Sequence, residues 1–309
     1  MEKELHISIV SPVYKAENII NELVAKVSEE VFKLTTKFDI ILVEDASPDN
    51  SWNKIKELCS KHSFVKGIKF SRNFGQHNAI AAGILEAKGD LIVLMDCDLQ
   101  DDPKHIELLV DQFKLGNEIV YTTRIKRKHT FFKYITARIY NSLFKIVADK
   151  NFDLNVGSLV LFSKKVKDEF LKLTEHYKLY IQSLKWLGFK HVYIPVEHRE
   201  RFEGESSYKL KDLIKLALQG WVSNSEKLLY ISIKLGFAFS LISILAIIYV
   251  FYKSFTIGFD PGWPSLICVI LLCTGVILIS LGVLGIYIGK IFNEVKNRPL
   301  FIIDKKINF

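Results

Sequence analysis

Two long stretches near the end of the chain contain no charged residue, and they limit the possible folds more than any other feature. They are Leu235–Tyr252 and Ser265–Gly289. As helices they would be roughly 27 and 37 Å long at 1.5 Å per residue, and the hydrocarbon core of a bilayer is about 30 Å thick. A pair of buried helices in a soluble domain is the alternative, which the length of the second stretch disfavours. We therefore predict two transmembrane helices at these positions.

The connector between the two stretches, residues 253–264, is short and rich in turn-forming residues, so the helices are expected to form a hairpin with both chain ends on one side of the membrane. Lysine and arginine are frequent before and after the hairpin, whereas the connector contains only Lys253. By the positive-inside rule, both ends are expected in the cytoplasm. The sequence MEKELHISIV at the start has mixed charge and a short apolar run, so no cleavable signal peptide is expected.

The rest of the chain alternates short apolar runs with helical patterns. The strand-like runs cover residues 6–13, 39–43, 65–70, 90–95 and 118–122, and the helical patterns cover about 17–34, 50–61, 75–87 and 103–115. This alternation is typical of an α/β domain with a mostly parallel central sheet, in which ligands bind beyond the carboxyl ends of the strands. The four cysteines are not spaced as metal ligands, and disulfides between them are not expected either.

Four aspartates gather after one of these runs, in LIVLMDCDLQDDP (residues 91–103), although the chain has a formal net charge of +8. Asp96 and Asp98 are two residues apart, so in extended backbone both carboxylates point to one face and could bind one cation. Mg²⁺ and Mn²⁺ take such oxygen ligands and usually keep positions for substrate phosphates. Gln100 continues the alternation and could add its amide oxygen. A solvated acidic turn is the alternative, which a second acidic cluster elsewhere disfavours.

That second cluster is ILVEDASPDNS, residues 41–51, at the end of another predicted strand. Asp45 is placed to accept hydrogen bonds from a base or ribose, as acidic residues do in other nucleotide-binding sheets. Asp49 is expected to cap the following helix. Pro12, Tyr14 and Glu17 close the first strand and could flank the same base, although a structural turn would also explain Pro12.

Two amphipathic segments could hold such a site against a membrane surface. Thr130–Val147 has apolar residues at helical spacing with Arg138 and two lysines among them, and Tyr208–Trp221 leads towards the first apolar stretch. In each, a face buried in the protein core is the alternative. The basic run from Arg124 to Lys128, which includes Arg127, could bind phosphate or lipid, or be a solvated surface. No nucleic-acid-binding motif is present, so nucleic acid is not an expected partner.

The loop RFEGESSYK, residues 201–209, combines cations, hydroxyl groups and a flexible glycine. Arginine can contact phosphate with two parallel hydrogen bonds, so Arg201 suits a loop that closes over a diphosphate or an acceptor phosphate. Ser206, Tyr208 and Lys209 would add further contacts to the phosphate. A plain surface loop is the alternative.

These segments occur in an order that resembles the family-2 glycosyltransferases of the polyprenyl-phosphate type, which include dolichol-phosphate mannose synthase and bacterial undecaprenyl-phosphate glucosyltransferases with a two-helix anchor. The resemblance is carried by SPVYKAEN, VEDASPDNS, SRNFGQHNAIAAG, AKGDLIVLMDCDLQDDP, VYTTRIKRKHTFFKYITARIY, WLGF and RFEGESSYKLKDLIKLAL. It implies a GT-A type nucleotide-sugar-binding domain in which Asp96, Asp98 and Gln100 organise Mg²⁺ or Mn²⁺ and the diphosphate. It also implies donor contacts from Asp45 and Arg72, and phosphate contacts from Arg124 and Arg201.

The implied reaction is a metal-dependent, inverting transfer of a sugar from a nucleotide-sugar to a polyprenyl phosphate at the cytoplasmic face of a bacterial inner membrane. Transfer to a lipid-linked glycan and a catalytically silent, partner-binding membrane protein are the alternatives. The expected layout is a catalytic domain at 1–206, a juxtamembrane segment at 207–228, the hairpin within 229–289 and a cytoplasmic tail at 290–309. The hairpin could also pack against copies of itself in a homo-oligomer.

One departure from the family pattern lies in LNVGSLVLFSK, residues 154–164. Many relatives carry an acidic residue and an arginine where this chain has Ser158 and Val160. The resemblance places these positions near the reacting centre, which leaves open a different sugar or acceptor.

Overall fold

The computed structural model describes residues 4–124, 156–173, 179–197 and 262–309, and single positions between 232 and 256. The chain divides into two compact units. The first comprises Met1–Lys128, Asp153–Ser206 and Arg298–Phe309, and the second comprises His129–Phe152 and Ser207–Asn297. The first unit therefore contains the end of the chain as well as its beginning.

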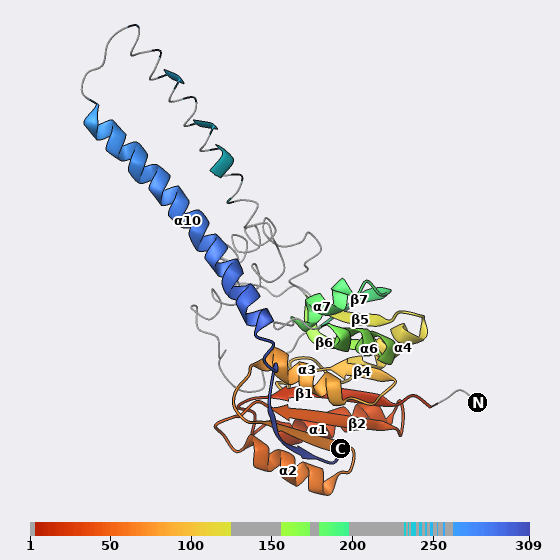
Figure 1. The fold of residues 1–309 in the computed structure, drawn as a ribbon. Coiled ribbons are helices and arrows are strands. Elements are labelled where there is room, and N and C mark those ends of the chain that lie inside the picture. Colours follow the sequence, from red (N-terminus) through yellow and green to blue (C-terminus); the bar gives the residue numbers. More distant parts are fainter. Residues whose placement is uncertain are drawn as a thin grey trace. The chain divides into compact units, whose positions relative to one another are not determined.

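The first unit is built on a sheet with the strand order β7-β5-β6-β4-β1-β2-β3-β8 (Figure 1). Its strands are β1 (Ile7–Val13), β2 (Phe38–Glu44), β3 (Val65–Phe70), β4 (Leu91–Leu94), β5 (Ile119–Arg124), β6 (Val156–Ser163), β7 (His191–Val196) and β8 (Ile303–Ile307). Its helices are α1 (Ile20–Phe32), α2 (Ser51–Lys61), α3 (Gln76–Glu86), α4 (His105–Lys114), α6 (Lys164–Lys172) and α7 (Tyr180–Trp186).

The sheet is mostly parallel. The pairs β1–β2, β1–β4, β2–β3 and β5–β7 are parallel, whereas β4–β6, β5–β6 and β3–β8 are antiparallel. The neighbouring strands β4, β1, β2 and β3 therefore present their carboxyl ends at the same edge. Ligands of open α/β sheets bind at such an edge.

Two hydrophobic clusters fill the two faces of the sheet. Side chains of α1, α2 and α4 pack on one face, with Leu23, Ile55 and Leu109 among the buried residues. Side chains of α3, α6 and α7 pack on the other, with Ile80 and Phe170 among them. The strands β1, β2 and β4 are buried along their whole length, because a sheet covered on both faces has no solvent side.

The structure confirms the five strands and four helices that the sequence predicts before residue 125, with boundaries that differ by up to three residues. Strands β6, β7 and β8 and helices α6 and α7 are additional. The end of the chain is predicted only as a tail, but residues 303–307 form β8, which pairs with β3 and completes one edge of the sheet.

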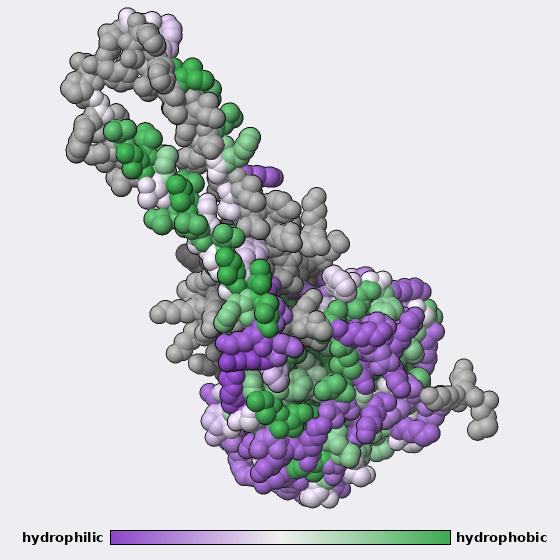
Figure 2. Space-filling model, viewed as in Figure 1, coloured by the Kyte–Doolittle hydropathy of each residue, from purple (hydrophilic) through white to green (hydrophobic). Residues whose placement is uncertain are grey.

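The second unit contains α10 (Trp263–Val295), which matches the second predicted membrane span and extends it at both ends. Within α10, Leu272–Phe292 has a mean hydropathy of 2.2, and it is the one helix among the described residues that is long and apolar enough to cross a membrane. Figure 2 shows hydrophobic side chains along this helix. In the first predicted span, Leu241, Ile242 and Tyr249 are helical, and much of the span lies outside the described residues. Two crossings are therefore not confirmed.

Candidate functional site

Three loops lie at the carboxyl edge of the sheet, after β1, β2 and β4. Each contains a non-glycine residue in the left-handed region: Lys15 at φ 52°, Ala46 at φ 48° and Leu99 at φ 53°. This conformation costs an L-residue about 1–2 kcal/mol, and such strain is concentrated at binding and active sites. Hydrogen bonds between the loops offset it, since the Lys15 amide donates to Ser47 Oγ at 2.8 Å.

The predicted metal ligands Asp96 and Asp98 lie in the loop after β4, and both are partly buried. Gln76 Nε2, at the start of α3, donates to Asp96 Oδ1 at 2.7 Å. The backbone amide of Gln100 donates to Asp98 Oδ1 at 3.1 Å. Burial, together with the nearby carboxylates of Asp98 and Asp101, raises the pKa of Asp96 to about 6. Like charges thus accumulate at this point of the edge.

Ser158 lies next to this cluster. Its hydroxyl donates to Asp101 Oδ2 at 2.6 Å, and Asp101 is only 2% exposed. Leu94 pairs with Val160 in the antiparallel β4–β6 ladder, so continuing the register by two residues sets Ser158 opposite Asp96. Val160, in contrast, is fully buried in the core and does not face the loop.

The residue types at this edge fit a hard divalent cation. Within the described ranges, no group of three or more His, Cys, Asp or Glu side chains is arranged to hold a metal by itself. Mg²⁺ is commonly held by one or two carboxylates while substrate phosphates and waters fill its other positions. The pair of Asp96 and Asp98 therefore suits a metal that binds together with a diphosphate.

Asp45 lies directly after β2 and is 3% exposed. Its Oδ1 accepts the amide of Phe74 at 2.6 Å, and its Oδ2 accepts the amide of Gly75 at 2.8 Å. Burial raises the pKa of Asp45, and these two hydrogen bonds oppose that rise. The carboxylate predicted to contact a nucleoside thus also fixes the loop before α3. Gly75, at φ 95° and ψ 154°, adopts a conformation that favours glycine.

Glu17 and Asp49 join the loops that follow β1 and β2. The Glu17 amide donates to Asp49 Oδ2 at 3.1 Å, and the Asn50 amide donates to Glu17 Oε2 at 2.8 Å. Burial would raise the pKa of Asp49, but hydrogen bonds from Ser47, Ser51 and the Glu17 amide lower it overall. Asp49 accepts the Ser51 amide but is not the N-cap residue of α2, which is Asn50. Glu17 therefore has a structural role in addition to the predicted donor contact.

The other predicted donor residues differ in exposure. Pro12 is buried within β1, and Tyr14 is 40% exposed with the ammonium of Lys15 5.7 Å from its ring centre. Arg72 is exposed and stacks over the Phe74 ring at 4.4 Å. Arg124 ends β5, where its backbone pairs with Val196. Both amphipathic segments lie outside the described residues. So do six of the predicted site residues, which are Arg127, Arg138, Arg201, Ser206, Tyr208 and Lys209.

Sequence reasoning missed Gln76 and Asp101, which contact Asp96 and Ser158, respectively. Gln76 is present in the quoted segment SRNFGQHNAIAAG, which follows β3. Because the loops after β2, β3 and β4 meet at one edge, polar residues after β3 were the available signal.

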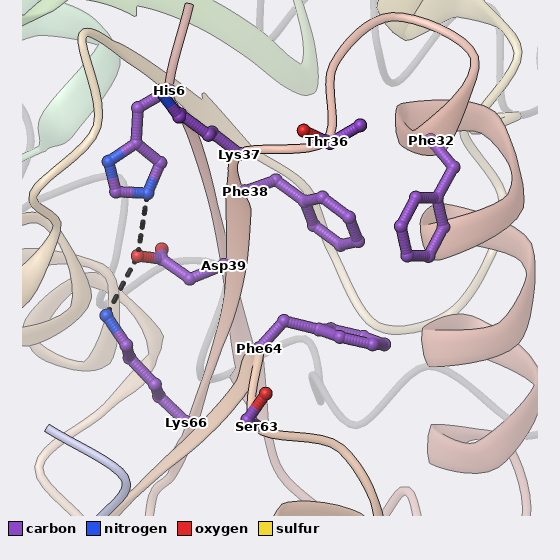
Figure 3. Close-up of a pocket in the computed structure, with 9 residues that line it drawn as sticks. All are labelled: His6, Phe32, Thr36, Lys37, Phe38, Asp39, Ser63, Phe64 and Lys66. Carbon is purple, nitrogen blue, oxygen red and sulfur yellow. Dashed lines mark hydrogen bonds and ion pairs between the residues drawn. The ribbon is translucent and has the colours of Figure 1, made fainter.

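A pocket of about 520 Å³ lies at the opposite edge, where β1, β2 and β3 begin (Figure 3). Asp39 Oδ2 accepts from Lys66 Nζ at 2.8 Å and lies 3.2 Å from His6 Nε2. The Phe32 and Phe38 rings form another wall, with ring centres 4.7 Å apart. Since parallel sheets bind ligands at the carboxyl edge, this pocket does not belong to the candidate donor site.

Comparisons with known proteins identify the family of the chain. The family model for glycosyl transferase family 2 matches residues 8–171. The chain is 38% identical over 307 residues to the uncharacterized glycosyltransferase YkcC of Bacillus subtilis (strain 168), which covers 99% of this chain and 95% of that protein. It is 30% identical over 314 residues to an undecaprenyl-phosphate 4-deoxy-4-formamido-L-arabinose transferase of Edwardsiella ictaluri, with coverage of 97% and 94%.

Solved structures show the same fold. The glucosyl-3-phosphoglycerate synthase of Mycobacterium tuberculosis, crystallised with Mn²⁺ and UDP-glucose, superposes with a TM-score of 0.51 at 16% sequence identity. The match covers 71% of this chain and 77% of that one. At this identity the likeness supports the α/β fold and nothing finer.

Proposed function

Because the chain belongs to glycosyltransferase family 2, we propose that it transfers a sugar from a nucleotide-sugar to a polyprenyl phosphate at the cytoplasmic face of a membrane. The observation that carries the proposal is the placement of Asp45 after β2 and of Asp96 and Asp98 after β4, the two strands on either side of β1, at the carboxyl edge of the sheet. A nucleotide lying along this edge would meet Asp45 first and bring its diphosphate to the aspartate pair.

Asp96 and Asp98 would hold Mg²⁺ or Mn²⁺, with Gln100 beside them. When bound, the metal neutralises the charge that builds up on the departing diphosphate. The Gln76 amide orients the Asp96 carboxylate, and Ser158 orients Asp101 next to it. We assign Tyr14, Glu17 and Arg72 to the donor side. Arg124 and Arg201 are assigned to phosphate contacts.

The proposed reaction is a single displacement. An oxygen of the lipid phosphate attacks the anomeric carbon, the bond from that carbon to the diphosphate oxygen breaks, and the diphosphate leaves with the electron pair. A phosphate nucleophile is already ionised near neutral pH, so no strong general base is required. One displacement without a covalent enzyme intermediate inverts the anomeric configuration.

The acceptor assignment is supported by the similarity to undecaprenyl-phosphate transferases and by the apolar helix α10. A polyprenyl phosphate lies in the bilayer with its phosphate at the surface, so the enzyme must work next to the membrane. The amphipathic segments at 130–147 and 208–221 are proposed to lie at that surface, in line with their sequence pattern.

Strand pairing supports the two-pass topology. β8 follows α10 in the chain, yet it pairs with β3, so segments before and after the apolar region belong to one folded unit. A bilayer cannot divide a folded unit, so the chain between these segments must cross the membrane an even number of times. With Leu272–Phe292 as one crossing, we propose that Leu235–Tyr252 supplies the other.

The proposal is tested with the purified full chain, undecaprenyl phosphate and a panel of radiolabelled nucleotide-sugars, with Mg²⁺, Mn²⁺ or a chelator. We expect label to enter the organic phase with one donor, only with metal present, and to fall at least a hundredfold in Asp98→Asn. Asp111→Asn is the matched control, since Asp111 is exposed on α4 and pairs with Lys114 at 3.2 Å. Transfer only to a lipid-linked glycan would overturn the acceptor, and absence of nucleotide binding would favour a silent protein.

A further inference from the structure

The segment called here the 71–76 loop, Ser71–Gly75 together with Gln76 as the first residue of α3, connects β3 to α3 and reaches the candidate donor site. Its Phe74 and Gly75 amides donate to the Asp45 carboxylate, and Asn73 Nδ2 donates to the Asp45 carbonyl oxygen at 3.2 Å. Its last residue, Gln76, contacts Asp96 at 2.7 Å. This 71–76 loop therefore contacts both the carboxylate assigned to the nucleoside and one assigned to the metal.

The opposite end of the 71–76 loop is held by residues that follow α10. The Ser71 amide donates to the Ile302 carbonyl oxygen at 3.1 Å. Phe301 stacks on Phe70, with ring centres 5.2 Å apart and an angle of 12° between the ring planes. The β3–β8 register shifts at Phe70, the point at which β3 gives way to the loop.

An aromatic chain continues from there into the loop. Phe70 is fully buried and meets Phe74 edge to face at 5.6 Å, with an angle of 87° between the rings. Arg72 in turn lies over the Phe74 ring. The contacts therefore run from Phe301 through Phe70 to Phe74, and the Phe74 amide is a hydrogen-bond donor to Asp45.

We propose that Phe301 is a positioning residue for donor binding. Residues 301–303, which follow α10, hold the 71–76 loop in one conformation through their contacts with Phe70 and Ser71. The inference rests on the proposed function, which places the donor at Asp45 and Asp96. The face of Phe301 fixes the orientation of Phe70, and Phe70 fixes the ring of Phe74. The amides of Phe74 and Gly75 then meet Asp45 in one arrangement, so the nucleotide side of the site is formed before the donor arrives.

Phe301 lies close to the end of α10 in the sequence. Only five residues, Lys296–Leu300, separate it from the end of α10 at Val295. The 71–76 loop is thus held by the segment that directly follows the apolar helix α10. Loss of the contact between Phe301 and Phe70 is expected to weaken binding of the nucleotide-sugar donor while leaving the chemical step unchanged.

The first test compares Phe301→Ala, Phe301→Tyr and the unmodified full chain in detergent. Binding of UDP and of GDP with Mn²⁺ is measured by calorimetry, and KM and kcat are measured with the donor found active. An aromatic pair contributes enough for about a three- to tenfold rise in Kd and in the donor KM for Phe301→Ala, with kcat within twofold. Phe301→Tyr is expected to keep the ring stack and restore both values.

Ile307→Ala is the matched control, because Ile307 lies in β8, which follows Phe301, and pairs with Gly67, away from the loop. Melting temperatures of both alanine variants show whether each remains folded. If Ile307→Ala raises Kd as much as Phe301→Ala, or if Phe301→Ala leaves Kd unchanged, the positioning role is wrong.

Amide hydrogen exchange tests, without any nucleotide, whether Phe301 holds the 71–76 loop in place. In Phe301→Ala, the Phe74 and Gly75 amides are expected to exchange at least about tenfold faster, whereas amides in the centre of β1 keep their protection. Unchanged exchange at these two amides would overturn the inference. Failure of the unmodified chain to bind either nucleotide would contradict the proposed function separately.

Discussion

At the scale of single residues, the arrangement around Asp96 shows how a cluster of carboxylates is held in place. Gln76 and Ser158 each donate one hydrogen bond into the cluster, and each comes from a different element. Both bonds join segments far apart in the chain. The sequence therefore predicts the aspartates themselves, which follow an obvious strand, but not their partners, which depend on how α3 and β6 pack beside β4.

Ser158→Ala tests whether this support matters. The change removes the hydrogen bond to Asp101 Oδ2, and a buried charged group that loses a donor costs about 1–3 kcal/mol. We expect a lower melting temperature and a higher metal concentration for half-maximal activity. The control is Ser28→Ala, since the Ser28 hydroxyl on α1 donates to the Ala25 carbonyl oxygen at 2.9 Å, within the same helix and far from the carboxylate cluster. Equal effects of the two changes would contradict the role of Ser158.

His77 gives a second prediction at this scale. Burial lowers the pKa of His77 from 6.5 to about 4, and its ring lies 5.8 Å from that of Tyr180. The unfolded chain then binds a proton below pH 6.5 that the folded chain binds only below about pH 4. Stability should therefore fall as pH drops through this window, by roughly 2 kcal/mol at pH 5.

The measurement is the melting temperature at pH 7.5 and pH 5.0. His77→Gln is expected to lose less stability between the two values than the unmodified protein, because a proton-binding group has been removed. His191→Gln, at an exposed position, should retain the full difference. A difference that persists undiminished in His77→Gln would assign the effect to other groups.

At the scale of elements, the predictable strands are those buried on both faces. β1, β2 and β4 are buried at every position and mostly apolar because helices cover them on each side. β8, in contrast, reads IDKKI, with three charged residues in five, and lies at an edge of the sheet. Charges suit an edge strand because they discourage pairing with other chains. The same charges remove the apolar signal by which a strand is recognised.

The contact between β2 and β3 at the amino edge yields a prediction about stability. Asp39 is 3% exposed, and its carboxylate pairs with Lys66 and His6. Lys66→Met leaves this buried charge poorly compensated, which typically costs about 3–5 kcal/mol. We expect a clearly lower melting temperature but an unchanged donor KM, because the pair lies opposite the donor edge.

The double variant Asp39→Leu with Lys66→Met separates charge from packing. Replacing both partners removes the buried charge, so much of the lost stability should return. If the double variant is less stable than Lys66→Met alone, loss of packing rather than an uncompensated charge explains the single change.

At the scale of the whole molecule, the return of the chain to β3 after α10 links membrane topology to the fold. The proposed hairpin, with an even number of crossings, rests on this pairing and on α10 as one crossing. We expect an epitope tag inserted after Gly258 to be reached by antibody from outside intact spheroplasts. A tag placed at the N-terminus should be reached only after the membrane is opened. Protection of both tags in intact spheroplasts would contradict the hairpin.

The late position of β8 also has a consequence for biosynthesis. A ribosome must translate the whole apolar region before residues 303–307 can emerge and pair with β3. Until then, the backbone groups along one side of β3 stay open, and the 71–76 loop lacks its contact with Ile302. A nascent chain that stalls before residue 303 therefore leaves an incomplete sheet that quality-control proteases could recognise. The sheet of the first unit is therefore complete only after α10 has been translated.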